Sequence, residues 1–255
     1  MLKIENSEVV GWEHAIRGMR NPMNSWDRSD SCTRGEVWCN EFCDDTFEAE
    51  PGYKCGFDTG LRLGPNDYEL MTKLVKGGPV HAKYRRMIIV YLDITAPLYW
   101  WKEFDTYKVG TVANSCSTMH KIQDKEFTMD DFSHEHLSGE RELSLDDHCP
   151  GFFGATQEFS GSSISILRII CDALNFYRQK FLETKNKDYW WQMIQLLPSS
   201  YNQKRTIVLN YEVLANLYKG RCNHKLDEWH IFCDWIETLP YSELITRKET
   251  TTDVT

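Results

Sequence analysis

Three segments of the chain concentrate polar side chains of the kinds that bind ligands. A histidine can exchange a proton, an asparagine both donates and accepts hydrogen bonds, and an arginine holds an anion. Each segment also has a purely structural interpretation, as a surface histidine, a helix-capping asparagine or an arginine that complements a helix dipole. Together they indicate a binding site more strongly than any one of them does. The segments are Gly78 to His81, Lys108 to His120, and Asn210 through Arg221 to Trp229.

Other reactive side chains give weaker signals. Ser117 has no histidine and aspartate paired near it in the sequence, so a serine nucleophile is not indicated. The run His134-Glu135-His136 cannot place both histidines on one face of a helix, which disfavours a metal site. No Gly-x-Gly-x-x-Gly or Walker sequence is present, so neither of the usual phosphate-cradling loops is available. The sequence therefore leaves the catalytic residues unknown and favours no metal ligand.

The chain has nine cysteines, and four of them fall between Cys32 and Cys55. Zinc is one interpretation of this cluster, but the spacing lacks the Cys-x-x-Cys knuckle that presents two thiolates from one tight turn. Because no secretion signal is visible, thiols are favoured over a disulfide framework. The sequence therefore favours ordinary thiols in a long loop.

Composition and charge exclude several classes of protein. The 255 residues are 41% hydrophobic and 26% charged, which is typical of a folded chain. The formal net charge of −9 opposes binding to nucleic-acid backbones, and the one short basic cluster, Lys83-Tyr84-Arg85-Arg86, flanks a predicted strand. No apolar run is long enough to span a membrane, and Met1 to Glu5 begins no signal peptide. We therefore expect a cytoplasmic protein that binds neither nucleic acid nor a membrane.

The polar segments lie between elements that indicate an α+β fold, mostly helical and with few strands. Asn66 and Glu69 have the spacing of a capping box, and Gly77-Gly78 supplies a stop for the helix that follows. Apolar residues at helical spacing, and β-branched runs between turn signals, predict the other elements. The predicted helices cover 66–77, 97–107, 163–183, 189–197, 210–220 and 226–239, and the predicted strands cover 86–95 and 205–209.

The remaining chain is predicted to be irregular. Residues 1–64 show no sustained period, and Asn21 to Gly64 reads as a long loop that carries the clustered cysteines. Residues 108–120 fit neither a helix nor a strand, and the polar tail 246–255 is expected to be flexible. We expect a single domain over 1–255.

In this order, the motifs from Asn66 to Leu239 resemble the flavin-dependent thymidylate synthase family. That family has a helix, a glycine–histidine turn, a strand, an Ala-Pro step into a helix, and then an Arg-His-Arg signature that continues as Ser-x-Asn-x-x-Ser-x-Arg. A closing block runs Leu-Pro, Tyr, Asn, Asn, Arg and Trp. The matching residues here are Leu74 to His81, Met87 to Ile94, Ala96-Pro97, Thr111, Asn114, Ser117, Leu197-Pro198, Tyr201, Asn210, Asn216, Arg221 and Trp229.

The resemblance implies a thymidylate-synthase-like fold with a small antiparallel sheet, and a homotetramer with its sites at subunit interfaces. It also implies FAD, a uridine nucleotide and a folate as family ligands. By this similarity, the flavin side would hold His81, Tyr107, Lys108, Asn210 and Asn216. The nucleotide side would hold Glu103, Thr111, Asn114, Ser117 and Arg221.

This chain departs from the family where the family binds phosphate. Thr106-Tyr107-Lys108 replaces Arg-His-Arg, and Met119 replaces the last arginine of the signature. Glu103 stands where a glutamine is usual and Glu212 where an arginine is, and both would repel an anion that they faced. Threonine and methionine cannot form the paired charge-assisted bonds of a guanidinium. Two such losses, at about 1.5–3 kcal/mol each, weaken binding by about two to four decades.

These observations favour a protein that binds or sequesters a nucleotide or a nucleotide-derived signal, as a viral (phage) counter-defence protein does. The segment Arg17 to Ser25 offers replacement cations. The alternative is an active FAD-dependent enzyme that methylates dUMP to dTMP. A third hypothesis, a purely structural interaction protein, would rely on the pairs Trp100-Trp101 and Trp190-Trp191.

Overall fold

The computed structural model describes residues 2–32, 62–140, 143–144 and 160–247. These residues fall into two compact units, which are described separately. Unit 1 comprises residues 1–3, 95–105 and 115–205, and unit 2 comprises residues 4–94, 106–114 and 206–255, each within the described ranges.

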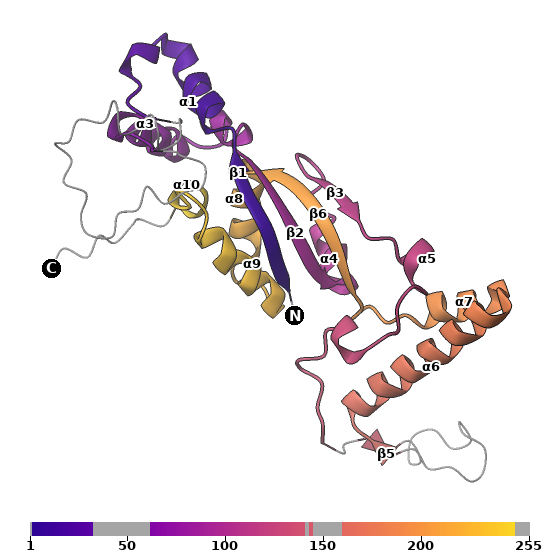
Figure 1. Cartoon of the computed structure of the whole chain (residues 1–255). Coiled ribbons are helices and arrows are strands. Elements are labelled where there is room, and N and C mark those ends of the chain that lie inside the picture. Colours follow the sequence, from indigo (N-terminus) through magenta and orange to yellow (C-terminus); the bar gives the residue numbers. More distant parts are fainter. Residues whose placement is uncertain (1, 33–61, 141–142, 145–159, 248–255) are drawn as a thin grey trace, which may run out of the picture. The chain divides into compact units, whose positions relative to one another are not determined.

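The main sheet has four strands and is antiparallel, as Figure 1 shows. A second pair of short strands, also antiparallel, aligns Leu143 with Gly161. The prediction of an α+β fold, mostly helical with a small antiparallel sheet, is therefore confirmed. In spatial order the four strands are β1 (Lys3–Val10), β2 (Ile89–Pro97), β6 (Asn202–Asn210) and β3 (Val112–Ser115), and the pair is β4 (Leu143–Ser144) with β5 (Ser160–Gly161).

Alternation along β2 gives the sheet one buried and one polar face. Val90, Leu92 and Ile94 are buried, because successive side chains of a strand point to opposite faces. On the polar face, the Asp93 carboxylate accepts hydrogen bonds from Asn6 Nδ2 at 3.0 Å and from Thr206 Oγ1 at 2.7 Å. One carboxylate thus ties β2 to both of its neighbours and fixes the register of the three strands.

The helices of unit 2 pack around an aromatic core. The Trp12 indole lies edge-on to Tyr211 at 5.4 Å and to Tyr241 at 5.5 Å between ring centroids. The α-helices are α1 (Trp12–Arg20), α3 (Pro65–Lys76), α8 (Tyr211–Arg221), α9 (Asp227–Glu237) and α10 (Glu243–Thr246). The 3₁₀ helices are η1 (Asn21–Met23), η2 (Trp26–Arg28) and η3 (Lys83–Arg86).

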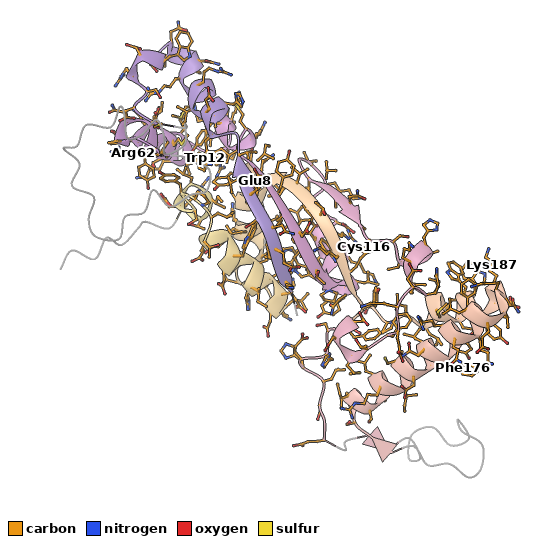
Figure 2. The ribbon with its side chains drawn as sticks, viewed as in Figure 1. Glu8, Trp12, Arg62, Cys116, Phe176 and Lys187 are labelled. Atoms are coloured by element: carbon orange, nitrogen blue, oxygen red, sulfur yellow. The ribbon has the colours of Figure 1, made fainter. Side chains whose placement is uncertain are left out.

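Unit 1 is built on a hairpin of two helices. Leu167, Cys171 and Leu174 on the long helix α6 pack with Met193 of α7 in one buried cluster. Phe176 of α6, labelled in Figure 2, is 55% exposed. None of the helices described is both long and apolar enough to cross a membrane. The helices of unit 1 are α4 (Leu98–Phe104), α5 (Thr118–Lys121), η4 (Met129–Asp131), α6 (Ser163–Thr184) and α7 (Lys187–Leu196).

The prediction of an irregular segment over residues 1–64 is wrong for β1 and α1. Helix α1 does carry a helical stripe, since Trp12, Ile16 and Met19 are buried at spacings of four and three residues. Polar and charged neighbours hid this pattern in so short a helix. Strand β1 has little apolar alternation and is held by its pairing with β2. Cys39, Cys43 and Cys55 of the predicted loop lie outside the described residues.

The predicted capping box at Asn66 and Glu69 is also wrong. Helix α3 begins at Pro65, and its first N–H groups are capped by Asp30. The Asp30 carboxylate accepts from the Asn66 N–H at 2.9 Å and from the Asp67 N–H at 3.1 Å. The capping group comes from a distant part of the sequence, so no local pattern predicts it. The stop is confirmed, since Gly77 caps the helix and Gly78 has a φ of 94°.

Residues 108–120, predicted as a loop, contain strand β3 and the single turn α5. The helix predicted over 97–107 is the shorter α4, with Pro97 as its N-cap. The later predictions are confirmed to within a few residues. Helices α6, α7, α8 and α9 lie where helical spacing predicted them, and β6 extends the predicted strand at its start.

Candidate functional site

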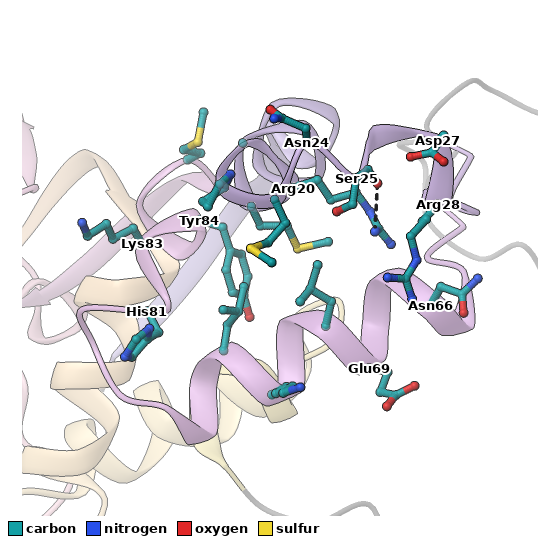
Figure 3. A pocket seen from close by; sticks show the side chains of 18 of the residues that line it. Arg20, Asn24, Ser25, Asp27, Arg28, Asn66, Glu69, His81, Lys83 and Tyr84 are labelled. Atoms are coloured by element: carbon teal, nitrogen blue, oxygen red, sulfur yellow. Dashed lines mark hydrogen bonds between the residues drawn. The ribbon is translucent and has the colours of Figure 1, made fainter.

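A cavity of about 890 Å³ lies within unit 2 (Figure 3). The end of α1, the 3₁₀ helices η1, η2 and η3, and one side of α3 contribute its walls. Its volume falls in the range of about 300–1,000 Å³ that small-molecule sites occupy. Met19, Leu70 and Met87 give it an apolar surface, and lysine, arginine and histidine side chains give it polar groups.

His81 lines this cavity from the turn that follows α3. The positive φ of Gly78 allows the chain to reverse, and its carbonyl then accepts from the N–H groups of His81 and Ala82, each at 3.0 Å. A Cβ on Gly77 would lie 3.2 Å from His81 Cδ2, so the imidazole packs against bare backbone there. The two glycines thus place the histidine.

A buried ion pair holds Arg20, which forms part of the cavity wall. Arg20 is 3% exposed and Asp67 is fully buried, and Arg20 Nε donates to Asp67 Oδ1 at 2.6 Å. Arg20 Nη1 donates to the Ser25 carbonyl oxygen at 3.2 Å. The second oxygen of Asp67 accepts from the hydroxyls of Ser29 and Ser31, each at 2.7 Å. This network joins α1, the segment after η2, and α3.

The network predicts how stability depends on pH. Burial alone raises the pKa of Asp67, but hydrogen bonds from Ser31, Ser29 and Arg20 outweigh it, and the pKa lies below its ordinary value. A lowered pKa in the folded state contributes stability above the ordinary aspartate pKa, and this is lost as the pH falls through the folded value. We therefore expect the free energy of unfolding to drop below about pH 4.

Urea titrations between pH 7 and pH 3 measure this dependence, and the variant Asp67→Asn is the comparison. The wild-type protein should lose its advantage over the variant as the pH falls. A constant difference in unfolding free energy across the range would contradict the assignment to Asp67.

Tyr107 and Arg221 are in direct contact in unit 2. Arg221 Nε donates to the Tyr107 hydroxyl at 3.1 Å, and the guanidinium carbon lies 5.5 Å from the Tyr107 ring centroid. The same carbon lies 4.9 Å from the Trp229 ring centroid. The guanidinium is thus held by aromatic partners at the end of α8.

Asn210 caps α8, as its structural interpretation predicts. Its Oδ1 accepts from the N–H groups of Glu212 and Val213, each at 3.1 Å. The helix has 11 residues, so its 1.5 Å rise separates Asn210 from Arg221 by about 16 Å. Glu212 forms a bidentate ion pair with Arg86. The charge of Glu212, which would repel an anion that it faced, is therefore paired.

The other predicted site residues are spread over both units. In unit 2, the side chains of Lys108, Asn114 and Asn216 are exposed and that of Thr111 is half-buried. Glu103 and Ser117 belong to unit 1. Ser117 caps α5 by accepting the His120 N–H at 3.1 Å, and it lines a separate cavity of about 490 Å³. The structure therefore brings Tyr107 and Arg221 together and places His81 on the larger cavity.

Sequence reasoning missed two cations of the larger cavity, Arg28 and Lys73. A signal for the buried network was nevertheless present. Asp67 lies on the same helical face as Met71 and Val75, at spacings of four residues, and a buried carboxylate requires a cationic or hydrogen-bonding partner. The partner Arg20 lies within the segment that the sequence identified as a source of cations.

Possible metal ligands are engaged in other contacts. His134 Nδ1 lies 2.8 Å from the Phe132 carbonyl oxygen, and Ser133 Oγ donates to Glu135 at 2.7 Å. Within the described ranges, no group of three or more histidine, cysteine, aspartate or glutamate side chains is arranged to hold a metal ion. No disulfide joins the cysteines in those ranges.

The chain has the fold of the flavin-dependent thymidylate synthases, which confirms the resemblance at the level of the fold. Thymidylate synthase X from Helicobacter pylori, solved with FAD and dUMP, matches with a TM-score of 0.57 at 14% identity, covering 96% of this chain and 97% of that one. A second structure of that enzyme, also with FAD and dUMP, gives 0.54 at 14% identity, with the same coverage.

A related match is the UMP/dUMP methylase PolB from Streptomyces cacaoi, solved with 5-bromo-UMP. Its TM-score is 0.52 at 12% identity, and the match covers 97% of this chain and 93% of PolB. No protein-family model matches the sequence, and no curated protein matches it significantly. At these identities the likeness establishes the fold.

Proposed function

We propose that this chain binds a nucleotide or a nucleotide-derived molecule in the unit 2 cavity. The observation that carries the proposal is the position of His81. His81 is predicted as a site residue by the family resemblance, and the two matching structures of Helicobacter pylori thymidylate synthase X hold FAD and dUMP. In this chain His81 lines a cavity large enough for such a ligand. No other predicted site residue lines this cavity.

The cavity lining suits a nucleotide. Met19, Met87 and the buried ring of Tyr84 offer polarisable and aromatic surface for a base. The Tyr84 hydroxyl donates to the Met71 carbonyl oxygen at 3.1 Å, which fixes the ring. His81 and Lys83 also line the cavity, although Figure 3 shows the Lys83 side chain extending away from Tyr84. The His81 imidazole can hold a phosphate or base oxygen.

The residues that replace the family signature do not fit a flavin pyrophosphate. A pyrophosphate needs cationic donors, whereas Thr106 and Tyr107 are neutral and Arg221 already donates to Tyr107, so Lys108 is the one cation left in the replaced signature. Asn210 uses its carbonyl oxygen as a helix cap. These contacts support binding or sequestration over methylation of dUMP. Sequestration of a nucleotide signal by a viral counter-defence protein is one form of this function.

Calorimetry with FAD, dUMP, UMP, AMP and cyclic dinucleotides tests the proposal. At least one of these ligands should bind, and His81→Ala should weaken that binding by about threefold to tenfold, the effect of one hydrogen bond. His14→Ala, an exposed histidine of α1 outside the cavity, is the matched control and should bind as the wild type does.

Two outcomes would overturn the proposal. One is that no member of the panel binds. The other is methylation of dUMP by the protein loaded with FAD, which would establish the alternative enzymatic function in place of sequestration. The same proposal includes assembly into a homotetramer and a cytoplasmic location. Light scattering measures the assembly.

A further inference from the structure

We propose that Arg20 and Arg28 form an anion subsite at one end of the unit 2 cavity, where they grip the phosphate group of the ligand. The inference rests on the proposed function and deepens it, because it assigns the phosphate to residues outside the altered family signature. The two arginines come from the end of α1 and from η2.

Arg20 is fixed by its hydrogen bonds so that one guanidinium nitrogen, Nη2, stays available. Nε and Nη1 are occupied by Asp67 and by the Ser25 carbonyl oxygen. Among the residues that the structure describes, Nη2 has no hydrogen-bond partner. Nη2 is also not one of the side-chain atoms that are buried without a partner, so it remains accessible. The rest of the side chain is buried and lines the cavity. A guanidinium fixed by two bonds presents its remaining donors without further loss of rotamer freedom.

Arg28 lies at the same end of the cavity. Figure 3 shows its guanidinium on the side of Ser25 and Asn66, away from His81 and Lys83. The Arg28 side chain has no ion pair or hydrogen bond within the described ranges, although Asp27 beside it also lines the cavity. It can therefore turn towards an anion without breaking an existing contact.

The charges of the lining favour an anion. Four lysine and arginine side chains line the cavity, against two carboxylates. Asp67 balances Arg20, but its oxygens are already filled by the two serines, by backbone N–H groups and by Arg20 itself. Arg20 is buried, so its charge is screened less than those of the exposed Arg28, Lys73 and Lys83.

The arrangement assigns an orientation to the ligand. The phosphate lies against the arginines, and the base lies towards Tyr84 and His81. The ligand class is therefore a phosphorylated nucleoside, and a nucleoside without phosphate should lose most of the affinity. Arginine suits this task because its planar fork matches phosphate oxygens.

Calorimetry with dUMP and AMP, and with deoxyuridine and adenosine, tests the subsite. Arg28→Gln should weaken binding of the monophosphates by about tenfold or more and leave the nucleosides unchanged. Arg20→Lys keeps a cation beside Asp67 and should show the same selectivity, with folding checked by thermal melting. Lys76→Gln, an exposed cation of α3 outside the cavity, is the control and should have little effect.

The outcomes separate this inference from the proposed function. If the wild type binds monophosphates and both arginine variants bind them equally well, the subsite is wrong and the proposed function stands. An equal loss of nucleoside and monophosphate affinity also overturns the subsite, because the arginines would then act on the shape of the cavity. If the wild type binds no nucleotide at all, both proposals fail.

Discussion

Replacing Asp67 with alanine is expected to lower the free energy of unfolding by about 3–5 kcal/mol, the usual cost of removing one partner of a buried ion pair. The substitution leaves the buried Arg20 guanidinium without its carboxylate partner. It also removes the hydrogen-bond acceptor of the Ser29 and Ser31 hydroxyls. The ion pair that connects α1 to α3 is thereby lost, and these two helices contribute walls of the cavity. Urea denaturation at pH 7 measures the loss.

Asp27→Ala is the control for this experiment, because Asp27 is an exposed carboxylate in the wall of the same cavity. Its effect should stay within about 0.5 kcal/mol, as is usual for surface substitutions. A loss of less than about 1 kcal/mol in the Asp67 variant would show that the network does not hold the helices together.

A methyl group at Gly11 is expected to have the second large effect. Gly11 has a φ of 92°, and a Cβ there would lie 2.1 Å from the Met87 carbonyl oxygen. Left-handed backbone costs other residues about 1–2 kcal/mol, and a forced shift of packed atoms costs about 1–3 kcal/mol. Gly11→Ala should therefore lower the free energy of unfolding by about 2–5 kcal/mol in a urea titration.

Gly78→Ala separates the two contributions. Its φ of 94° is nearly the same, but nothing lies within 4 Å of the added Cβ. It should show only the backbone cost of about 1–2 kcal/mol. Equal losses in the two variants would mean that the contact with Met87 does not constrain α1.

The parts of the fold that were predictable from sequence are those that local patterns determine. Helix α6 repeats apolar residues over many turns, and Asn210 caps α8 through its own next residues. The start of α3 was mispredicted because its cap, Asp30, is remote in sequence. Strand β1 was missed because its stability comes from pairing with β2.

The candidate site divides in the same way. His81 could be proposed from sequence because a glycine turn and a family motif coincide in one short segment, and its part in binding stays a prediction. Arg28 could not be proposed from sequence, because Arg28 and His81 line the same cavity only once η2 and α3 have folded together. Nothing in the spacing of these two residues predicts that meeting.

The ion pair between Arg86 and Glu212 bears on which residues position 212 can accept. By resemblance, the family has an arginine where Glu212 stands. The charge on Glu212 also acts on the buried Arg85 guanidinium. Glu212→Arg alone would bring the guanidiniums of positions 85, 86 and 212 together and leave Arg86 without its counter-ion. An arginine at position 212 would therefore require compensating changes at its cationic neighbours, so a single substitution to the family residue is expected to be unfavourable.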